Sequence, residues 1–130
     1  MSKSTKGGTY ALVIFLPRAT SIRVGALGTY DFPRGYYLYI GSALNGLTAR
    51  LARHLRHDKK MRWHIDYFLE HARVKELWTH QGAERFECAW AHAALELPKT
   101  KVIAPRFGAS DCACAAHLIY FGKSKPQNKR

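Results

Sequence analysis

The first third of the chain has the hydrophobic pattern of a β-sheet. Three segments rich in β-branched and aromatic residues are separated by proline and glycine, and they cover residues 9–16, 21–27 and 36–41. Pro17 ends the first segment because its ring nitrogen cannot donate to a strand ladder. The segment 31–35 contains a proline and a glycine and is typical of a turn leading into the third strand.

After the third strand the spacing of apolar residues changes to that of a helix. Four leucines recur every three or four positions, at Leu44, Leu47, Leu51 and Leu55. This spacing predicts an amphipathic helix over 44–57, with Asn45 as a cap at its start.

The second half of the chain mixes predicted helices and strands. A helix is expected over 62–70, and its inward face is formed by Trp63, Ile65 and Tyr67. A strand follows over 74–79. A further helix over 84–95 carries a buried stripe made of Phe86, Ala89, Trp90, Ala93 and Ala94. With a closing strand over 117–121, the order of elements predicts an α+β fold: a small, mainly antiparallel β-sheet flanked by helices.

The length of the chain, 130 residues, fits one domain and leaves no room for a second core. We place that domain at 9–122. Residues 1–8 are polar and are expected to be a flexible N-terminus, and residues 123–130 form a basic tail without apolar content that we expect to be disordered.

The charge balance indicates a polyanionic partner. Lysine and arginine number 21 against 9 acidic residues, which gives a net charge of +12 and a pI near 10.0. Such a domain repels itself, and a polyanion relieves the repulsion through counterion release. Nucleic acid is the commonest partner of this kind, an anionic membrane surface is its rival, and a basic surface without a partner is the plain alternative.

Nothing in the sequence predicts a membrane or secreted protein. The longest apolar runs are far shorter than the roughly 20 residues of a membrane span, and the N-terminus lacks a signal-peptide stretch. An odd number of cysteines, three, argues against a disulfide framework. We therefore expect a cytoplasmic protein with reduced thiols and no membrane partner.

One flank of the predicted helix 44–57 is basic, and the basic run continues beyond the helix. Long cationic side chains at these spacings can contact successive phosphates while the leucines hold the helix on the sheet. The predicted nucleic-acid contacts are Arg53, Arg56, His57, Lys59, Lys60 and Arg62. The alternative is an ordinary solvated face, which most charge runs are.

Two short motifs precede this helix and lead to a resemblance. The chain has Gly-Thr-Tyr at 8–10 and Tyr-Ile-Gly at 39–41, followed by an arginine and a histidine on the helix. This arrangement resembles the GIY-YIG nuclease superfamily, and looks most like a small, stand-alone branch of it. The resemblance implies a divalent-metal-dependent endonuclease that hydrolyses phosphodiester bonds in DNA. It implies that the catalytic residues are Tyr10, Tyr39, Arg50, His54 and Glu87.

The residue types suit this chemistry. Arg50 can offer a guanidinium fork to a non-bridging phosphate oxygen. Glu87, assigned by its order along the chain in competition with Glu84, Glu70 and Asp66, can anchor a single Mg²⁺ or Mn²⁺ ion. The family pattern suggests Tyr10 as the general base, which requires nearby cations to lower its pKa from about 10. His54 could hold Tyr10, hold a phosphate or be a second base.

The resemblance places a condition on the fold. Tyr10 and Tyr39 are separated by 28 residues, and this insert contains the candidate strand 21–27. If that strand lay between the other two, the tyrosines would be roughly 10 Å apart, too far to share one water. The mechanism therefore requires the insert to lie at an outer edge or to loop away.

A weaker motif suggests zinc as an alternative. Cys112, Cys114 and His117 have ligand-like spacing and Cys88 could complete a tetrahedral site, although structural zinc sites use a wider Cys-x₂-Cys pair. We favour the interpretation that these cysteines are small apolar thiols packed between helix and sheet, so zinc is not expected. Two other functions thus remain open: a non-catalytic nucleic-acid-binding module of the same fold, and a zinc-stabilised interaction domain.

Overall fold

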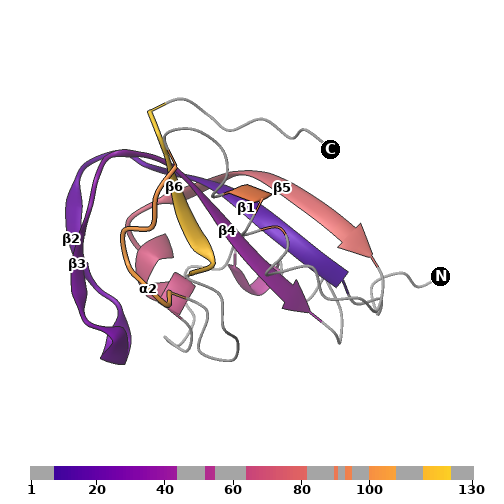
Figure 1. Ribbon diagram of the computed structural model, residues 1–130, viewed down its shortest axis with the longest axis horizontal. Helices are drawn as coiled ribbons and strands as arrows, with labels where there is room; N and C mark the ends of the chain where they lie inside the picture. The colour runs from indigo at the N-terminus through magenta and orange to yellow at the C-terminus, as the bar shows by residue number, and fades with distance from the viewer. Residues whose placement is uncertain are drawn as a thin grey trace.

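The protein is built on a four-stranded antiparallel sheet with the strand order β5-β1-β4-β6 (Figure 1). The computed structural model describes residues 8–43, 52–54, 64–81, 90, 93–94, 100–107 and 116–123. Its elements are β1 (Gly8–Leu16), β2 (Thr20–Arg23), η2 (Gly25–Leu27), β3 (Thr29–Phe32), β4 (Gly35–Ala43), α2 (His64–Leu69), β5 (Arg73–Gln81) and β6 (Leu118–Gly122). The predicted α+β class with a small, mainly antiparallel sheet is confirmed.

Strand β1 lies in the middle of the sheet and pairs along nearly its whole length on both sides. It is antiparallel to β4, with Tyr10 opposite Gly41 and Leu12 opposite Tyr39. It is also antiparallel to β5, with Tyr10 opposite Thr79. Its side chains are apolar on both faces because both faces of the sheet are covered.

The insert between the two tyrosine motifs forms a hairpin of its own. Strands β2 and β3 pair only with each other, as a separate two-stranded sheet. Figure 1 shows this hairpin curling away from the end of the main sheet. The insert therefore does not separate β1 from β4, and the condition set by the sequence is met.

The hairpin differs in detail from the predicted strand over 21–27. Strand β2 ends at Arg23, and Gly25–Leu27 form a 3-10 turn that Gly25 enters with a φ of 50°, a conformation that favours glycine. Thr29–Phe32 is a strand, although Asp31 and Phe32 were assigned to a turn. Pairing with β2 outweighs the turn-forming residues in this segment.

The main hydrophobic core lies on the face of the sheet that carries Tyr10, Leu12 and Tyr39. Phe32 from the hairpin, Phe68 from α2 and Phe107 meet edge to face above it, with ring centroids 5.2 to 6.4 Å apart. The hairpin is thus held by aromatic packing against α2 as well as by its own ladder.

Within α2 the inward residues differ from those predicted. Ile65 and Phe68 are fully buried, whereas Tyr67 is only half-buried and packs beside Gly25. The predicted inward residue Trp63 lies outside the described residues.

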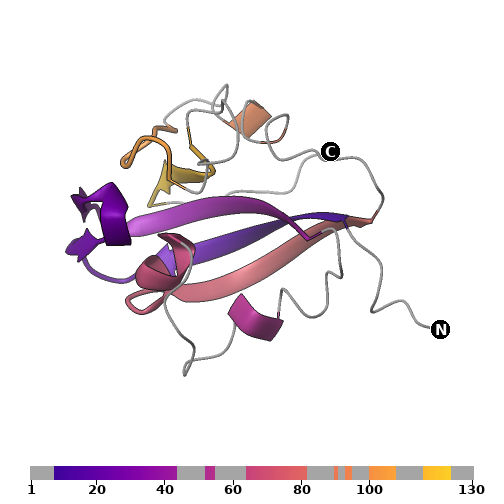
Figure 2. The ribbon, with the colours of Figure 1, turned by 90° about the horizontal axis from the view of Figure 1, so that it is seen from below.

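A smaller core lies on the second face of the sheet. It contains Ala11, Val13 and Ile40, with Trp90 and Ala94 packed against them. The expectation that Ala93 is buried is wrong, because it is exposed. Phe86 and Ala89, also predicted for this stripe, lie outside the described residues. In the edge view of Figure 2 the segments 52–54 and 93–94 lie on opposite sides of the sheet.

Candidate functional site

The hydroxyl of Tyr10 forms a hydrogen bond with the imidazole of His54. The distance from Oη to Nε2 is 2.7 Å, and the ring centroids are 5.4 Å apart. Tyr10 comes from the central strand and His54 from the helical segment 52–54. Both side chains are buried, with exposed fractions of 1% and 3%. Of the roles that the sequence leaves open for His54, contact with Tyr10 is the one present in the structure.

Tyr39 completes a cluster of three rings, which we call the Tyr10–Tyr39–His54 cluster. The Tyr39 centroid lies 6.4 Å from that of Tyr10 and 6.0 Å from that of His54. The register explains the approach: Tyr39 lies opposite Leu12, so it is the diagonal cross-strand neighbour of Tyr10 on the same face. Three residues predicted from separate parts of the chain therefore lie together.

Gly41 makes room for the phenol of Tyr10. A Cβ atom at position 41 would lie 2.5 Å from the hydroxyl oxygen and 2.7 Å from Cζ of Tyr10. Because the ring is buried, it cannot swing away from such a contact. The glycine of the Tyr-Ile-Gly motif thus has a steric role, which the sequence motif alone does not reveal.

We expect Gly41→Ala to lower the free energy of unfolding by about 1–3 kcal/mol, because the new methyl overpacks the phenol of Tyr10. Urea unfolding measures the change. The matched background is Tyr10→Leu, in which the clashing ring is absent. Equal costs of Gly41→Ala in both backgrounds would contradict a steric contact between these residues.

Arg53, the neighbour of His54, forms a bidentate ion pair with Asp66 of α2. Its Nη1 and Nη2 atoms lie 2.9 and 3.0 Å from the two carboxylate oxygens. Asp66 is fully buried, and the Arg53 side chain is 19% exposed. The pair ties the segment bearing His54 to α2. Arg53 was predicted from the sequence as a nucleic-acid contact, and Asp66 was named as an alternative to Glu87 as the metal ligand. An ion pair between Arg53 and Asp66 was not predicted.

His64, at the start of α2, shares an aromatic neighbour with Tyr39. The buried ring of Phe107 packs edge-on against both Tyr39 and His64, at 6.2 and 5.5 Å between centroids. Burial lowers the pKa of His64 below its ordinary value of 6.5. Its neutral form is thus preferred in the folded state.

This shift predicts a loss of stability in acid. Because the unfolded chain takes up a proton on His64 at a higher pH than the folded chain does, stability falls as the pH drops below about 6.5. Urea midpoints at pH 7.5 and 5.5 should differ less for His64→Gln than for the unmodified protein. His71→Gln, which removes an exposed histidine, is the control and should leave the difference unchanged.

Several predicted site residues lie outside the described residues. They are Arg50, Glu87, Arg56, His57, Lys59, Lys60, Arg62, Cys88, Cys112 and Cys114. His117 is described and buried, and its backbone N–H donates to the carbonyl of Phe107. In the described part of the chain, no three His, Cys, Asp or Glu side chains gather as metal ligands would. The magnesium and zinc sites therefore stay predictions.

The predicted helix 84–95 has its described residues on the second face. Trp90 and Ala94 pack against Ala11 and Val13, whereas the cluster lies on the first face. Glu87 lies outside the described residues, so its predicted role at the cluster stays a prediction.

By its fold and its cluster, the protein is a small α+β protein whose antiparallel sheet carries a buried, hydrogen-bonded tyrosine–histidine pair. A family model matches residues 9–130, so the chain belongs to that family, whose description is domain of unknown function DUF123. No curated protein and no solved structure gives a significant match. In the described residues, no helix has the length and apolar character needed to cross a membrane.

Proposed function

We propose that this protein is a cytoplasmic, divalent-metal-dependent endonuclease of the GIY-YIG type that hydrolyses phosphodiester bonds in DNA. One observation carries the proposal: the 2.7 Å hydrogen bond between Tyr10 Oη and His54 Nε2, with Tyr39 packed beside both rings. These are residues that the resemblance assigns to catalysis, and they come together from two strands and a helical segment. The net charge of +12 supports a polyanionic substrate.

The hydrogen bond gives Tyr10 a route to lose its proton. With ordinary pKa values of about 10 for a phenol and about 6.5 for an imidazole, transfer to His54 Nε2 costs about 5 kcal/mol. A cation beside the phenolate lowers this cost, and we assign that part to Arg50. The phenolate oxygen then accepts a proton from water while the water oxygen attacks phosphorus. The bond to the leaving oxygen breaks, and that oxygen takes a proton from solvent.

The remaining parts of the site follow from residue chemistry. Arg50 holds a non-bridging oxygen of the phosphate, and the cations after His54 hold neighbouring phosphates. Glu87 would hold one Mg²⁺ or Mn²⁺ ion, which when bound would stabilise charge on the phosphate. Asp66 is not available as a ligand in the present arrangement, because both of its oxygens receive hydrogen bonds from Arg53.

A second function, a nucleic-acid-binding module that does not cut, is favoured by two observations. Tyr10 and His54 are almost fully buried, and in this function their hydrogen bond joins the helical segment to the sheet and takes no part in chemistry. Two described residues of the helix predicted to carry Glu87, Trp90 and Ala94, pack on the other face. In this alternative the basic segment binds phosphates and the cluster is structural.

Nicking of supercoiled plasmid DNA by the full chain separates the two functions. The endonuclease produces relaxed circles with Mg²⁺ or Mn²⁺ and none with EDTA, and Arg50→Ala and Glu87→Ala lose this activity. Steeply salt-dependent binding without nicking in any divalent metal supports the binding module instead.

A further inference from the structure

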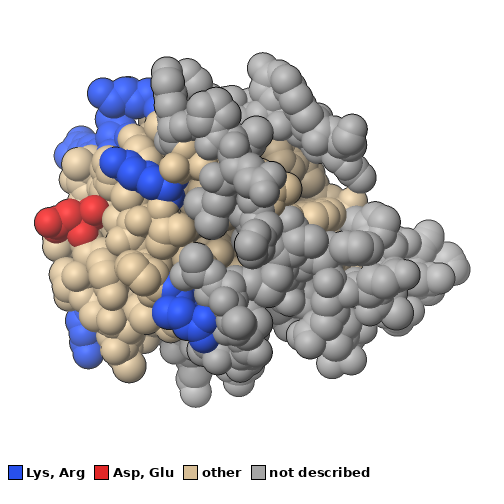
Figure 3. Space-filling view, in the orientation of Figure 1, with Lys and Arg blue, Asp and Glu red and all other residues tan. Residues whose placement is uncertain are grey.

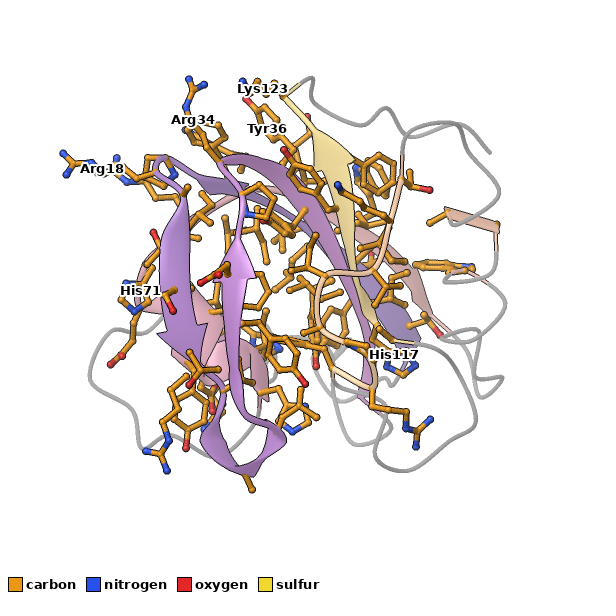
Figure 4. All side chains as sticks on the ribbon, turned by 60° about the vertical axis from the view of Figure 1, so that its left-hand side comes forward. Arg18, Arg34, Tyr36, His71, His117 and Lys123 are labelled. Carbon is orange, nitrogen blue, oxygen red and sulfur yellow. The ribbon has the colours of Figure 1, made fainter. Side chains whose placement is uncertain are left out.

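Four exposed cations gather at the end of the sheet where β4 begins. Arg34 immediately precedes β4 and Lys123 immediately follows β6, while Arg18 lies two residues after β1. Arg73 opens β5 opposite Phe15, at the same end. Figure 4 shows Arg18, Arg34 and Lys123 together with Tyr36 along this end, and Figure 3 shows lysine and arginine side chains gathered at the upper left.

Two half-buried aromatic rings lie among these cations. Phe15 and Tyr36 face each other across β1 and β4, with ring centroids 4.9 Å apart. The guanidinium of Arg34 stands over the Phe15 ring at 5.9 Å. Each ring has one side against its neighbours and keeps part of its surface open to solvent. Aromatic rings and cations are therefore found together at this end of the sheet.

No carboxylate in the described part of the chain forms an ion pair with the four cations of this surface. Among the residues that the structure describes, Arg18, Arg34, Arg73 and Lys123 form no ion pair, since the ion pair present joins Arg53 to Asp66. Asp31 and Glu70 are exposed on neighbouring elements but do not pair with them. The local field is thus strongly positive.

This surface is separate from the Tyr10–Tyr39–His54 cluster. Phe15 follows Tyr10 by five residues on the same strand, which places them about 17 Å apart along β1. The odd spacing also puts their side chains on opposite faces of the sheet. A ligand at one location therefore does not occupy the other.

We infer that Arg18, Arg34, Arg73 and Lys123, with Tyr36 and Phe15 between them, form a second nucleic-acid-binding surface that takes single strands. The cations contact successive phosphates. Tyr36 and the guanidinium plane of Arg34 offer stacking surfaces for unpaired bases. A duplex does not fit this chemistry, because its bases are already stacked on one another. The inference does not depend on hydrolysis at the cluster.

Fluorescence anisotropy of the full chain with labelled oligothymidine tests the stacking role of Tyr36. Tyr36→Leu should weaken binding about tenfold, whereas Tyr36→Phe keeps the ring and should bind as the unmodified protein does. A DNA duplex of equal length should show no difference between the two variants. Oligouridine in place of oligothymidine shows whether the surface prefers RNA or DNA.

The role of the cations is tested by a matched pair of charge removals. Arg34→Gln should reduce the slope of log affinity against log salt by about 0.7, the value for one phosphate contact on a single strand. Arg23→Gln removes an equal charge from the distant end of the hairpin and should leave the slope unchanged. Circular dichroism and thermal unfolding confirm that each variant is folded.

Three results overturn the inference. The first is an equal reduction of the salt slope by Arg34→Gln and Arg23→Gln. The second is an affinity of Tyr36→Leu for oligothymidine equal to that of the unmodified protein. The third is displacement of oligothymidine by an acidic peptide or by anionic vesicles at equal charge. Nicking of supercoiled plasmid is measured separately from oligothymidine binding and tests the hydrolysis alone. Failure of this surface and failure of the proposed hydrolysis are therefore distinguishable.

Discussion

Replacing Tyr10 with phenylalanine is expected to lower the rate of plasmid nicking at least about 100-fold, the usual contribution of a positioned proton-transfer group. The change removes only the hydroxyl that lies 2.7 Å from His54 Nε2 and leaves the buried ring in place. His54→Gln should have an effect of similar size, because it removes the other partner of the same hydrogen bond. Initial rates of plasmid relaxation with Mg²⁺ or Mn²⁺ measure both.

The matched control is Tyr37→Phe, which removes a hydroxyl from another buried tyrosine, on β4 and on the same face of the sheet as Tyr10. Burial and the nearby phenol of Tyr120 raise the pKa of Tyr37, so its hydroxyl stays protonated and donates to the carbonyl of Pro33. This bond involves neither Tyr10 nor His54, and the nicking rate per folded molecule should not change. A rate for Tyr10→Phe equal to that of Tyr37→Phe would remove Tyr10 from the mechanism.

Replacing Arg53 with alanine is expected to lower the free energy of unfolding by about 3–5 kcal/mol. The loss is large because Asp66 stays behind as a fully buried carboxylate without its bidentate partner. Since total stabilities of small domains are about 5–15 kcal/mol, the variant should be close to unfolding at room temperature. Urea unfolding followed by tryptophan fluorescence measures the difference.

Two variants distinguish the loss of stability caused by breaking the buried ion pair from that caused by removing any positive charge. Arg23→Ala removes an exposed arginine from β2 and should cost less than about 0.5 kcal/mol. Arg53→Met combined with Asp66→Leu removes both charges together and should recover most of the loss. If Arg53→Ala and Arg23→Ala cost the same, the ion pair contributes nothing measurable to the fold.

The strands of the main sheet could be predicted because local pattern and tertiary environment agree in them. Residues 9–16 and 36–41 are rich in β-branched and aromatic side chains, and they form most of β1 and β4. Strand β3 was not predicted, since Asp31 and the following proline and glycine are local signals for a turn. Only the ladder with β2, formed across the hairpin, makes that segment a strand.

The candidate site was predicted in part, and the missing part depends on tertiary contacts. The resemblance selected Tyr10, Tyr39 and His54, and these three side chains lie together. The ion pair of Arg53 with Asp66 joins residues 13 positions apart on separate elements, a distance over which helix periodicity gives no information. The steric role of Gly41 likewise depends on the β1–β4 register.

The arrangement of the main sheet has a consequence for how the chain folds. The partners of its strands are remote in sequence: Gly8 pairs with Gln81, and Tyr36 with Gly122. Closing such long loops lowers the entropy of the chain before the stabilising contacts between the strands have formed. Folding is therefore slower than in a protein built from local contacts. During synthesis the β2–β3 hairpin can close early, whereas β4 has to wait for β6, so its edge is open to intermolecular pairing until β6 has been made.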